Sequence, residues 1–214
     1  MLHGYDISNH NYQFVSQAPL TIRNGAFVWC KATEGVTFVD RAFKSYMAIY
    51  DNMVRGAYHY ARPENNSAKD EANHFLDTVW EVLEKGPMLL ALDWEGRALD
   101  YPESWILEWM RAVEERVDGK PLIYIQASAL SAIPNVIAAD YGLWIAEWNN
   151  TLSPSYKGLW AFHQYDYSLL DINSFNGNMK QLNKYTCSIK KEILPSEPPC
   201  CGNCRCCTRS KCER

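Results

Sequence analysis

Short apolar runs rich in β-branched and aromatic residues recur along the chain, and the intervals between them shorten toward the C-terminus. The runs begin at or near Gly4, Ala26, Val54, Met88, Pro121, Gly142 and Leu159. From Ala26 to Pro121 the intervals are about 28 to 34 residues, enough for a strand and a crossover helix, and the last two are about 21 and 17 residues. This pattern predicts parallel strands joined by helices, with strands that follow one another more directly near the end.

Helical periodicity fills three of the intervals. Residues 68–83 repeat apolar side chains at helical spacing after Ser67, whose hydroxyl suits an N-cap. A second helix is predicted from Pro102, placed in its first turn, through Val117, and a third at residues 41–52. Strand–helix alternation that contracts into successive strands predicts an α/β barrel whose last part lacks full helices. A doubly wound open sheet is the competing fold, but the glycine-rich phosphate loop typical of it does not follow the first strand.

Polar side chains stand at or just beyond the ends of several predicted strands. They are Asp6, Glu34, His59, Asp93, Glu95, Gln126, Glu147, Gln164 and Asp166. In barrels of this type the active site lies at the carboxyl ends of the strands, so we expect several of these groups to converge on one rim. A strand buried on both sides has no structural use for a carboxylate. The recurrence of carboxylates at the strand ends therefore favours a functional site.

The most specific of these features is the pair Asp93 and Glu95, which lies in Leu92-Asp-Trp-Glu95 at the end of an apolar strand. Residues two apart in a strand face the same side, about 6.6 Å apart along the backbone. Two carboxyl groups this close in a partly dry site raise the pKa of at least one of them, which keeps it protonated near neutral pH. An acid beside a charged carboxylate is what cleavage of a glycosidic bond requires.

Aromatic residues at or near the strand ends suit a sugar-binding cleft. They are Tyr58, Tyr60, Trp94, Trp144, Trp148, Trp160 and Tyr165. The apolar C–H faces of sugars stack on aromatic rings, while their hydroxyls bind carboxylates and amides. Large aromatic side chains also pack beneath helices, so we expect about half of this set to lie in the core.

Two other chemistries use overlapping residues. Asp6, His59, Asp93 and Glu95 offer oxygen and imidazole ligands for a divalent metal ion. The chain has no His-x-His or His-x-x-x-His pair, however, and we predict neither a metal nor a cofactor. Nucleophilic catalysis by Cys30 is the other hypothesis, but its position in the middle of an apolar strand favours a buried structural cysteine.

Seven short stretches together resemble one known family and occur in the order of that family. They are Gly4-Tyr-Asp-Ile-Ser8, Lys31-Ala-Thr-Glu-Gly35, Gly56-Ala-Tyr-His-Tyr-Ala61, Leu92-Asp-Trp-Glu95, Leu143-Trp-Ile-Ala146, His163-Gln-Tyr-Asp166 and Asp171-Ile-Asn-Ser-Phe175. The chain is similar to the glycoside hydrolase family 25 lysozymes, which are N-acetylmuramidases. The resemblance covers residues 4 to about 184.

The resemblance implies an α/β fold, an incomplete TIM-like barrel of five βα units followed by three strands. It also implies that Glu95 is the general acid and that Asp93 orients the 2-acetamido group of the substrate or a water. Asp6 and Asp171 match the other two carboxylates of the site. The candidate substrate-binding residues are Tyr58, Tyr60, Glu34, Trp94, Gln126, Trp144, Glu147 and Gln164.

The expected activity is that of a lysozyme, which hydrolyses the β-1,4 bond between N-acetylmuramic acid and N-acetylglucosamine in bacterial peptidoglycan. We expect the acetamido oxygen of the substrate to attack, with retention, because neighbouring carboxylates on one strand are poorly placed to act from opposite sides of a sugar ring. A carboxylate nucleophile and an inverting water are the alternatives. Two other functions stay open as hypotheses: a catalytically silent barrel that binds wall sugars, and a metal-dependent polysaccharide deacetylase.

Charge and cysteine are unevenly distributed. The net charge of −4 divides into −7 for residues 1–187 and +3 for the rest, and six of the eight cysteines fall within residues 200–214. An acidic barrel argues against nucleic acid as a partner. We divide the chain into a catalytic barrel at 1–187, a proline-containing linker at 188–199 and a cysteine-rich tail at 200–214. The tail thiols are compatible with a reduced state, with three disulfides or with a metal site.

The sequence also bears on location and assembly. No apolar run approaches the roughly 18 residues that span a bilayer, so we expect no membrane insertion. The first residues show no export signal, which needs a basic start and an apolar segment. Without such a signal, we expect a protein such as a phage endolysin, which stays in the host cytoplasm until release and then acts on the bacterial wall. We also expect a monomer. Secretion is expected instead if a leader was removed.

Overall fold

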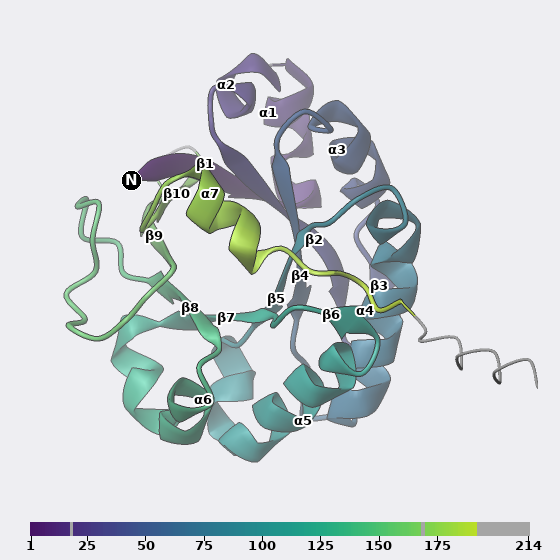
Figure 1. Cartoon of the computed structure of the whole chain (residues 1–214), viewed down its shortest axis with the longest axis vertical. Helices are drawn as coiled ribbons and strands as arrows, with labels where there is room; N and C mark the ends of the chain where they lie inside the picture. The colour runs from purple at the N-terminus through teal and green to yellow at the C-terminus, as the bar shows by residue number, and fades with distance from the viewer. Residues whose placement is uncertain (18, 168–169, 192–214) are drawn as a thin grey trace, which may run out of the picture.

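Strand β1 closes an eight-stranded barrel, because it pairs in parallel with β2 on one side and antiparallel with β10 on the other. The computed structural model describes residues 1–17, 19–167 and 170–191. Round the barrel the strands are β1 (Leu2–Ile7), β2 (Phe27–Glu34), β4 (Val54–Tyr60), β5 (Leu89–Asp93), β7 (Leu122–Gln126), β8 (Gly142–Ala146), β9 (Phe162–Asp166) and β10 (Asp171–Phe175). Figure 1 shows these strands at the centre, with the helices outside them. Residues 192–199 of the predicted linker and the cysteine-rich tail lie outside the described residues.

Helices follow each of the first five barrel strands. They are α1 (Tyr12–Gln17) and α2 (Pro19–Arg23) after β1, α3 (Phe43–Ile49) after β2, α4 (Ala68–Leu83) after β4, α5 (Glu103–Glu114) after β5 and α6 (Pro134–Ala138) after β7. After β8 the chain reaches β9 through a loop at residues 147–161 that contains no helix. The prediction of five βα units followed by three strands is therefore confirmed. Among the described residues, none of the helices is both long and apolar enough to cross a membrane.

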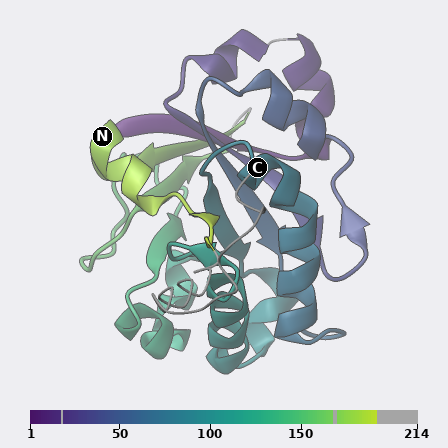
Figure 2. The same cartoon turned by 45° about the vertical axis from the view of Figure 1, so that its right-hand side comes forward.

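Short elements complete the fold and correct some predicted boundaries. They are β3 (Phe38–Val39), β6 (Val117–Asp118), β11 (Ser188–Ile189), α7 (Met179–Leu182) and the 3₁₀ helices η1 (Asn9–Asn11), η2 (Gly96–Asp100), η3 (Ala127–Ala132) and η4 (Asn183–Tyr185). Figure 2 shows β3 standing out from the barrel at the right of the view. Val117 does not end a helix as predicted, because it pairs with Ile189 in the β6–β11 ladder. Pro102 precedes α5 as its N-cap, with extended backbone angles, rather than lying in the first turn.

The barrel interior is filled by large side chains that alternate with outward-facing ones along each strand. The rings of Trp29 and Trp144 stack at its centre, with centroids 4.7 Å apart and planes 18° apart. Gly56 makes room for this stack, since a Cβ there would lie 2.3 Å from the Trp29 ring. At the amino ends of the strands, α7 contributes the buried Leu182 to the same cluster as Phe27. The interior is thus a packed core below the carboxyl-end rim, as expected for a barrel of this size.

A buried hydrogen bond between His59 and Glu71 joins the barrel to its helical layer. Nε2 of His59 on β4 lies 2.7 Å from Oε2 of Glu71 on α4, and both side chains are fully buried. Nδ1 of His59 lies 2.7 Å from Oγ1 of Thr33, and Trp109 of α5 stacks on the imidazole. Because side chains alternate along β4, His59 faces the helices and not the barrel interior. It is therefore not at the rim, where the metal hypothesis placed it.

Replacing Glu71 tests how strongly this pair holds the helix. The Glu71 carboxylate also accepts hydrogen bonds from the backbone N–H of Arg62 and the amide of Asn66. Glu71→Ala leaves these donors and His59 buried without their acceptor, and we expect it to lower the free energy of unfolding by about 3 kcal/mol. The matched control is Glu81→Ala on the same helix, where Glu81 pairs with Lys44 in solvent. Its expected change in urea unfolding is within about 0.5 kcal/mol, and equal losses for the two variants would contradict the assignment.

Candidate active site

A pocket of about 240 Å³ opens at the carboxyl ends of the strands. Its lining comes from most of the barrel strands and from two positions just beyond them: Asp6, Tyr58, Asp93, Glu95, Tyr124, Trp144, Trp148, Gln164 and Asp171. All four carboxylates expected from the sequence are among them. The structure therefore brings together residues that are up to 165 positions apart in the chain.

Backbone geometry places Asp93 and Glu95 on one side of the chain. Asp93 ends β5, and Glu95 continues the extended conformation, with φ −147° and ψ −179°. Gly96 then turns the chain with a φ of +59°, and a Cβ there would lie 2.9 Å from the hydroxyl of Tyr60. Trp94 points the opposite way, where it is 2% exposed and packs on Trp105. The structure thus gives no support to the prediction that Trp94 contacts sugar.

A hydrogen-bonded network fixes Asp6 on the opposite wall of the pocket. Its Oδ2 accepts hydrogen bonds from the side-chain amides of Asn173, at 2.7 Å, and Gln164, at 2.8 Å. The Oδ1 of Asn173 accepts from the indole N–H of Trp144, and the Oε1 of Gln164 accepts from the hydroxyl of Tyr124. Asp171 lies opposite Asp6 in the β1–β10 register. The side chains that position Asp6, directly or through one amide, therefore come from four other strands: β7, β8, β9 and β10.

Burial raises the pKa of all four carboxyl groups. It raises the pKa of Asp6 to about 7, assisted by the charge of Asp171 and opposed by the two amide hydrogen bonds. It raises the pKa of Asp93 well above the ordinary value, and the charge of Glu95 adds to the effect. The pKa values of Glu95 and Asp171 are raised for the same primary reason, and the nearby Lys31 lowers those of Asp93 and Glu95. The site therefore holds at least one proton near neutral pH, as we predicted from the closeness of Asp93 and Glu95.

A charged cluster lies beside the pocket without lining it. Glu34 pairs with Lys31 at 2.6 Å and with Arg62 at 2.5 Å. Burial alone would raise the pKa of Glu34, but the hydrogen bonds from Lys31 and Arg62 outweigh it and lower the pKa. The Tyr60 ring lies 4.8 Å from both cations. Glu34 and Tyr60, both predicted to bind substrate, thus support the rim next to Glu95.

Two further predicted substrate-binding residues do not line the pocket. Gln126 ends β7 and precedes η3. Glu147 accepts hydrogen bonds from the Asn149 side chain and the Ser155 backbone N–H, and these bonds lower its pKa. It therefore organises the loop between β8 and β9.

The aromatic candidates divide between the pocket and the core. Tyr58, Trp144 and Trp148 line the pocket, whereas Trp94, Trp160 and Tyr165 pack elsewhere. Tyr124 and Asn173 were not identified from the sequence as site residues. Alternation could have found Tyr124, because it lies two residues beyond the interior Leu122 on the same strand.

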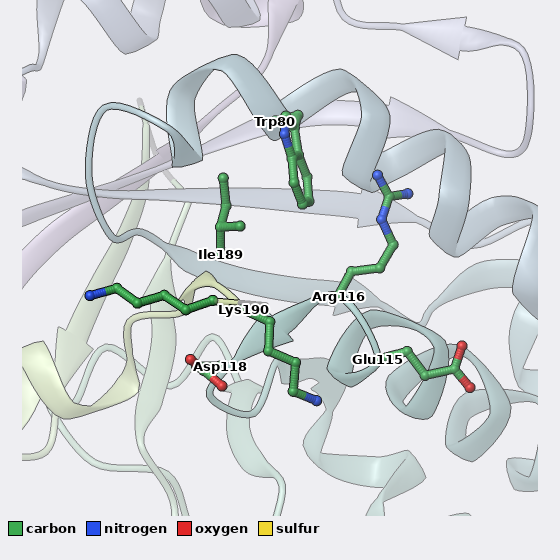
Figure 3. A pocket seen from close by; sticks show the side chains of 7 residues that line it. Trp80, Glu115, Arg116, Asp118, Ile189 and Lys190 are labelled. Carbon is green, nitrogen blue, oxygen red and sulfur yellow. The ribbon is translucent and has the colours of Figure 1, made fainter. Parts of the chain in front are cut away.

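A larger hollow, of about 860 Å³, is lined by residues of α4, β6 and β11 and by those that follow α5 and β11 (Figure 3). It is lined by Trp80, Glu115, Arg116, Asp118, Ile189, Lys190 and Lys191. Its charges are partly paired, since Arg116 binds Asp77 at 2.8 Å and stacks over Trp80. Across the described ranges, no group of three His, Cys, Asp or Glu residues is arranged to hold a metal ion. The carboxyl-end pocket is therefore the candidate site.

Comparison with known proteins identifies the family of this barrel. The family model for glycosyl hydrolases family 25 matches residues 5–174, most of the chain. The chain belongs to glycosyl hydrolases family 25. The pocket at the carboxyl ends of the strands is thus part of a glycoside hydrolase barrel.

Individual known proteins are similar to this chain over nearly the whole barrel. "Uncharacterized protein YegX" of Escherichia coli O6:H1 is 29% identical, covering 89% of this chain and 75% of its own. The "N,O-diacetylmuramidase" of Arthroderma benhamiae is 27% identical, covering 85% of each chain. The solved structure of a family GH25 lysozyme from Aspergillus fumigatus is 25% identical, with a TM-score of 0.69, and covers 86% of this chain and 98% of its own.

The raised pKa of Asp6 predicts a pH-dependent gain of stability on its replacement. Between about pH 4 and pH 7 the folded family 25 barrel keeps a proton on Asp6 that the unfolded chain releases, so this contribution to stability falls as pH rises. Asp6→Asn keeps an oxygen to accept both amide hydrogen bonds but cannot ionise. We expect it to raise the free energy of unfolding by about 2 kcal/mol at pH 8 and to change it little at pH 4.

Urea unfolding at the two pH values measures this effect. The control is Asp51→Asn, because Asp51 is exposed in a turn, and we expect no pH-dependent gain from it. A loss of stability for Asp6→Asn at pH 8, or equal gains at both pH values, would show that burial does not dominate the titration of Asp6.

Proposed function

We propose that the protein is a peptidoglycan N-acetylmuramidase that hydrolyses the β-1,4 bond between N-acetylmuramic acid and N-acetylglucosamine. The observation that carries this proposal is the convergence of four carboxyl groups with raised pKa values on one aromatic-walled pocket. The names of two relatives, an N,O-diacetylmuramidase and a family GH25 lysozyme, support the same substrate class. The proposed place of action is the bacterial cell wall, after release or secretion.

Glu95 is the proposed general acid. It lines the pocket and is less buried than Asp93, so it is the member of the pair that can reach a glycosidic oxygen. Burial raises its pKa, which keeps a proton available nearer to neutral pH. The opposing effect of Lys31 limits this rise and favours release of the proton to the leaving group.

Asp93 is the proposed partner of the substrate acetamido group. It is only 7% exposed, and its Oδ1 is buried with no hydrogen-bond partner among the described residues. A buried acceptor without a donor is costly, and the N–H of an acetamido group would supply the missing donor. This bond also favours the ionised form of Asp93 when substrate is bound, in spite of the raised pKa without substrate.

The proposed route has two steps. The acetamido oxygen attacks the anomeric carbon while Glu95 donates its proton to the departing oxygen, which breaks the glycosidic bond and leaves a cyclic oxazolinium ion beside Asp93. Water then attacks the anomeric carbon and gives a proton to Glu95, which restores the acid and reopens the acetamido group. Both steps use the same two carboxyl groups and need no further reactant.

Replacing the acid tests the proposal directly. Glu95→Gln preserves the size of the side chain but removes its proton, so we expect the rate of clearing of a bacterial suspension to fall about 10³-fold. Mass spectrometry of the wild-type digest is expected to find fragments with muramic acid at the reducing end. The control is Glu81→Gln on the exposed face of α4, with an expected rate within about twofold of wild type.

Each other function has a distinct outcome in this experiment. Equal clearing by the wild type and Glu95→Gln would show that Glu95 is not the acid. Binding of peptidoglycan without cleavage by the wild type would favour a silent sugar-binding barrel. Acetate release that a chelator stops would favour a polysaccharide deacetylase.

The stereochemistry of the first product tests the two-step route. Attack by the acetamido oxygen and then by water inverts the anomeric carbon twice, so we expect the β anomer to form first. Proton NMR of the reaction within its first minutes, before mutarotation, measures the anomer. An α anomer formed first would exclude the acetamido route and favour an inverting water.

A further inference from the structure

Two exposed aromatic side chains stand together beside the pocket. Trp148 is 47% exposed and Tyr167 is 64% exposed, although both are large apolar groups. Their rings meet edge to face, with centroids 5.2 Å apart and planes 69° apart. They follow β8 and β9, which are adjacent parallel strands, so both lie at the carboxyl-end rim. Exposed apolar surface next to a site usually marks a binding surface.

Trp148 is held in place by the same network that positions Asp6. Its indole N–H donates to Oε1 of Gln164 at 3.0 Å. The hydroxyl of Tyr124 donates to the same oxygen, and the Gln164 amide donates to Asp6. A side chain fixed by a buried polar group loses less conformational entropy on binding than a free one. The exposed Trp148 ring is thus preorganised while its edge lines the pocket.

The pocket is too small to hold more than one sugar of a glycan strand. About 240 Å³ is below the range of pockets that enclose drug-sized ligands, so the pocket accommodates one sugar ring rather than a length of polymer. The next sugar of a strand must lie outside it, on the rim. The rim beside Trp148 offers aromatic rings there, and the apolar C–H face of a pyranose is complementary to such rings.

We propose that Trp148 and Tyr167 form a stacking platform for the sugar of a β-linked N-acetylhexosamine strand that adjoins the sugar held in the pocket. This inference rests on the proposed function for the identity of the strand. The platform makes the enzyme selective for a glycan strand over a single sugar, because it binds a sugar that lies outside the carboxylate pocket.

Binding to an inactive enzyme tests the platform apart from catalysis. Full-length Glu95→Gln serves as the parent, and calorimetry measures Kd for un-cross-linked peptidoglycan hexasaccharide. Chemical-shift titration measures Kd for N-acetylglucosamine. We expect Tyr167→Ala and Trp148→Ala, each added to the parent, to weaken hexasaccharide binding about 10-fold. For Tyr167→Ala, the Kd for the single sugar is expected to stay within about twofold of the parent.

Two substitutions at Tyr167 separate ring stacking from bulk. Tyr167→Phe keeps the ring and is expected to keep the hexasaccharide Kd of the parent, whereas Tyr167→Leu keeps apolar bulk and is expected to behave like alanine. Leu159→Ala is the surface control, because Leu159 is 88% exposed at the far end of the β8–β9 loop. Circular dichroism of each variant checks that the barrel is folded.

The outcomes distinguish this inference from the proposed function. Unchanged hexasaccharide binding in both alanine variants would overturn the platform. Equal weakening of hexasaccharide and single-sugar binding by Tyr167→Ala would also overturn it, because the residue would then act on the pocket. If the wild type fails to cleave peptidoglycan while the alanine variants still weaken strand binding, the proposed function fails and the platform stands.

Discussion

A closed barrel must be filled, and the stack of Trp29 on Trp144 joins the two largest side chains that fill this one. The stack is accommodated only because Gly56 has no side chain to collide with Trp29. Trp144 also lines the pocket and donates its indole N–H to Asn173, which in turn binds Asp6. Trp144 therefore takes part both in the packing of the core and in the network that positions Asp6.

This packed floor explains why the carboxyl groups above it are held in unfavourable surroundings. Burial favours their neutral forms, whereas the amides of Asn173 and Gln164 favour ionised Asp6, and the balance raises its pKa to about 7. Natural proteins commonly lose stability at functional sites of this kind. Apolar burial in the barrel interior and under α4 and α5 sustains the fold in spite of this cost.

Much of the fold could be predicted from the sequence because apolar residues repeat with different periods in strands and helices. A strand whose inward-facing side chains are polar gives no such repeat. β10 directs Asp171 and Asn173 toward the site, so it shows no apolar run. Alternation placed Asp93 and Glu95 on one side, and the same argument would have put Trp94 on the other. The role of Glu34 depends on Arg62, which lies 28 positions away and which only the folded chain brings near.

The absence of a helix between β8 and β9 affects where a polymeric substrate can bind. A helix after each strand normally surrounds a barrel, but here a loop alone connects β8 to β9. Trp148 begins this loop, and Tyr167 follows β9 directly. The side of the rim without helices therefore carries the exposed pair of Trp148 and Tyr167. A polymer needs a surface that continues beyond the reacting bond, and the incomplete helical layer supplies one next to the carboxylates.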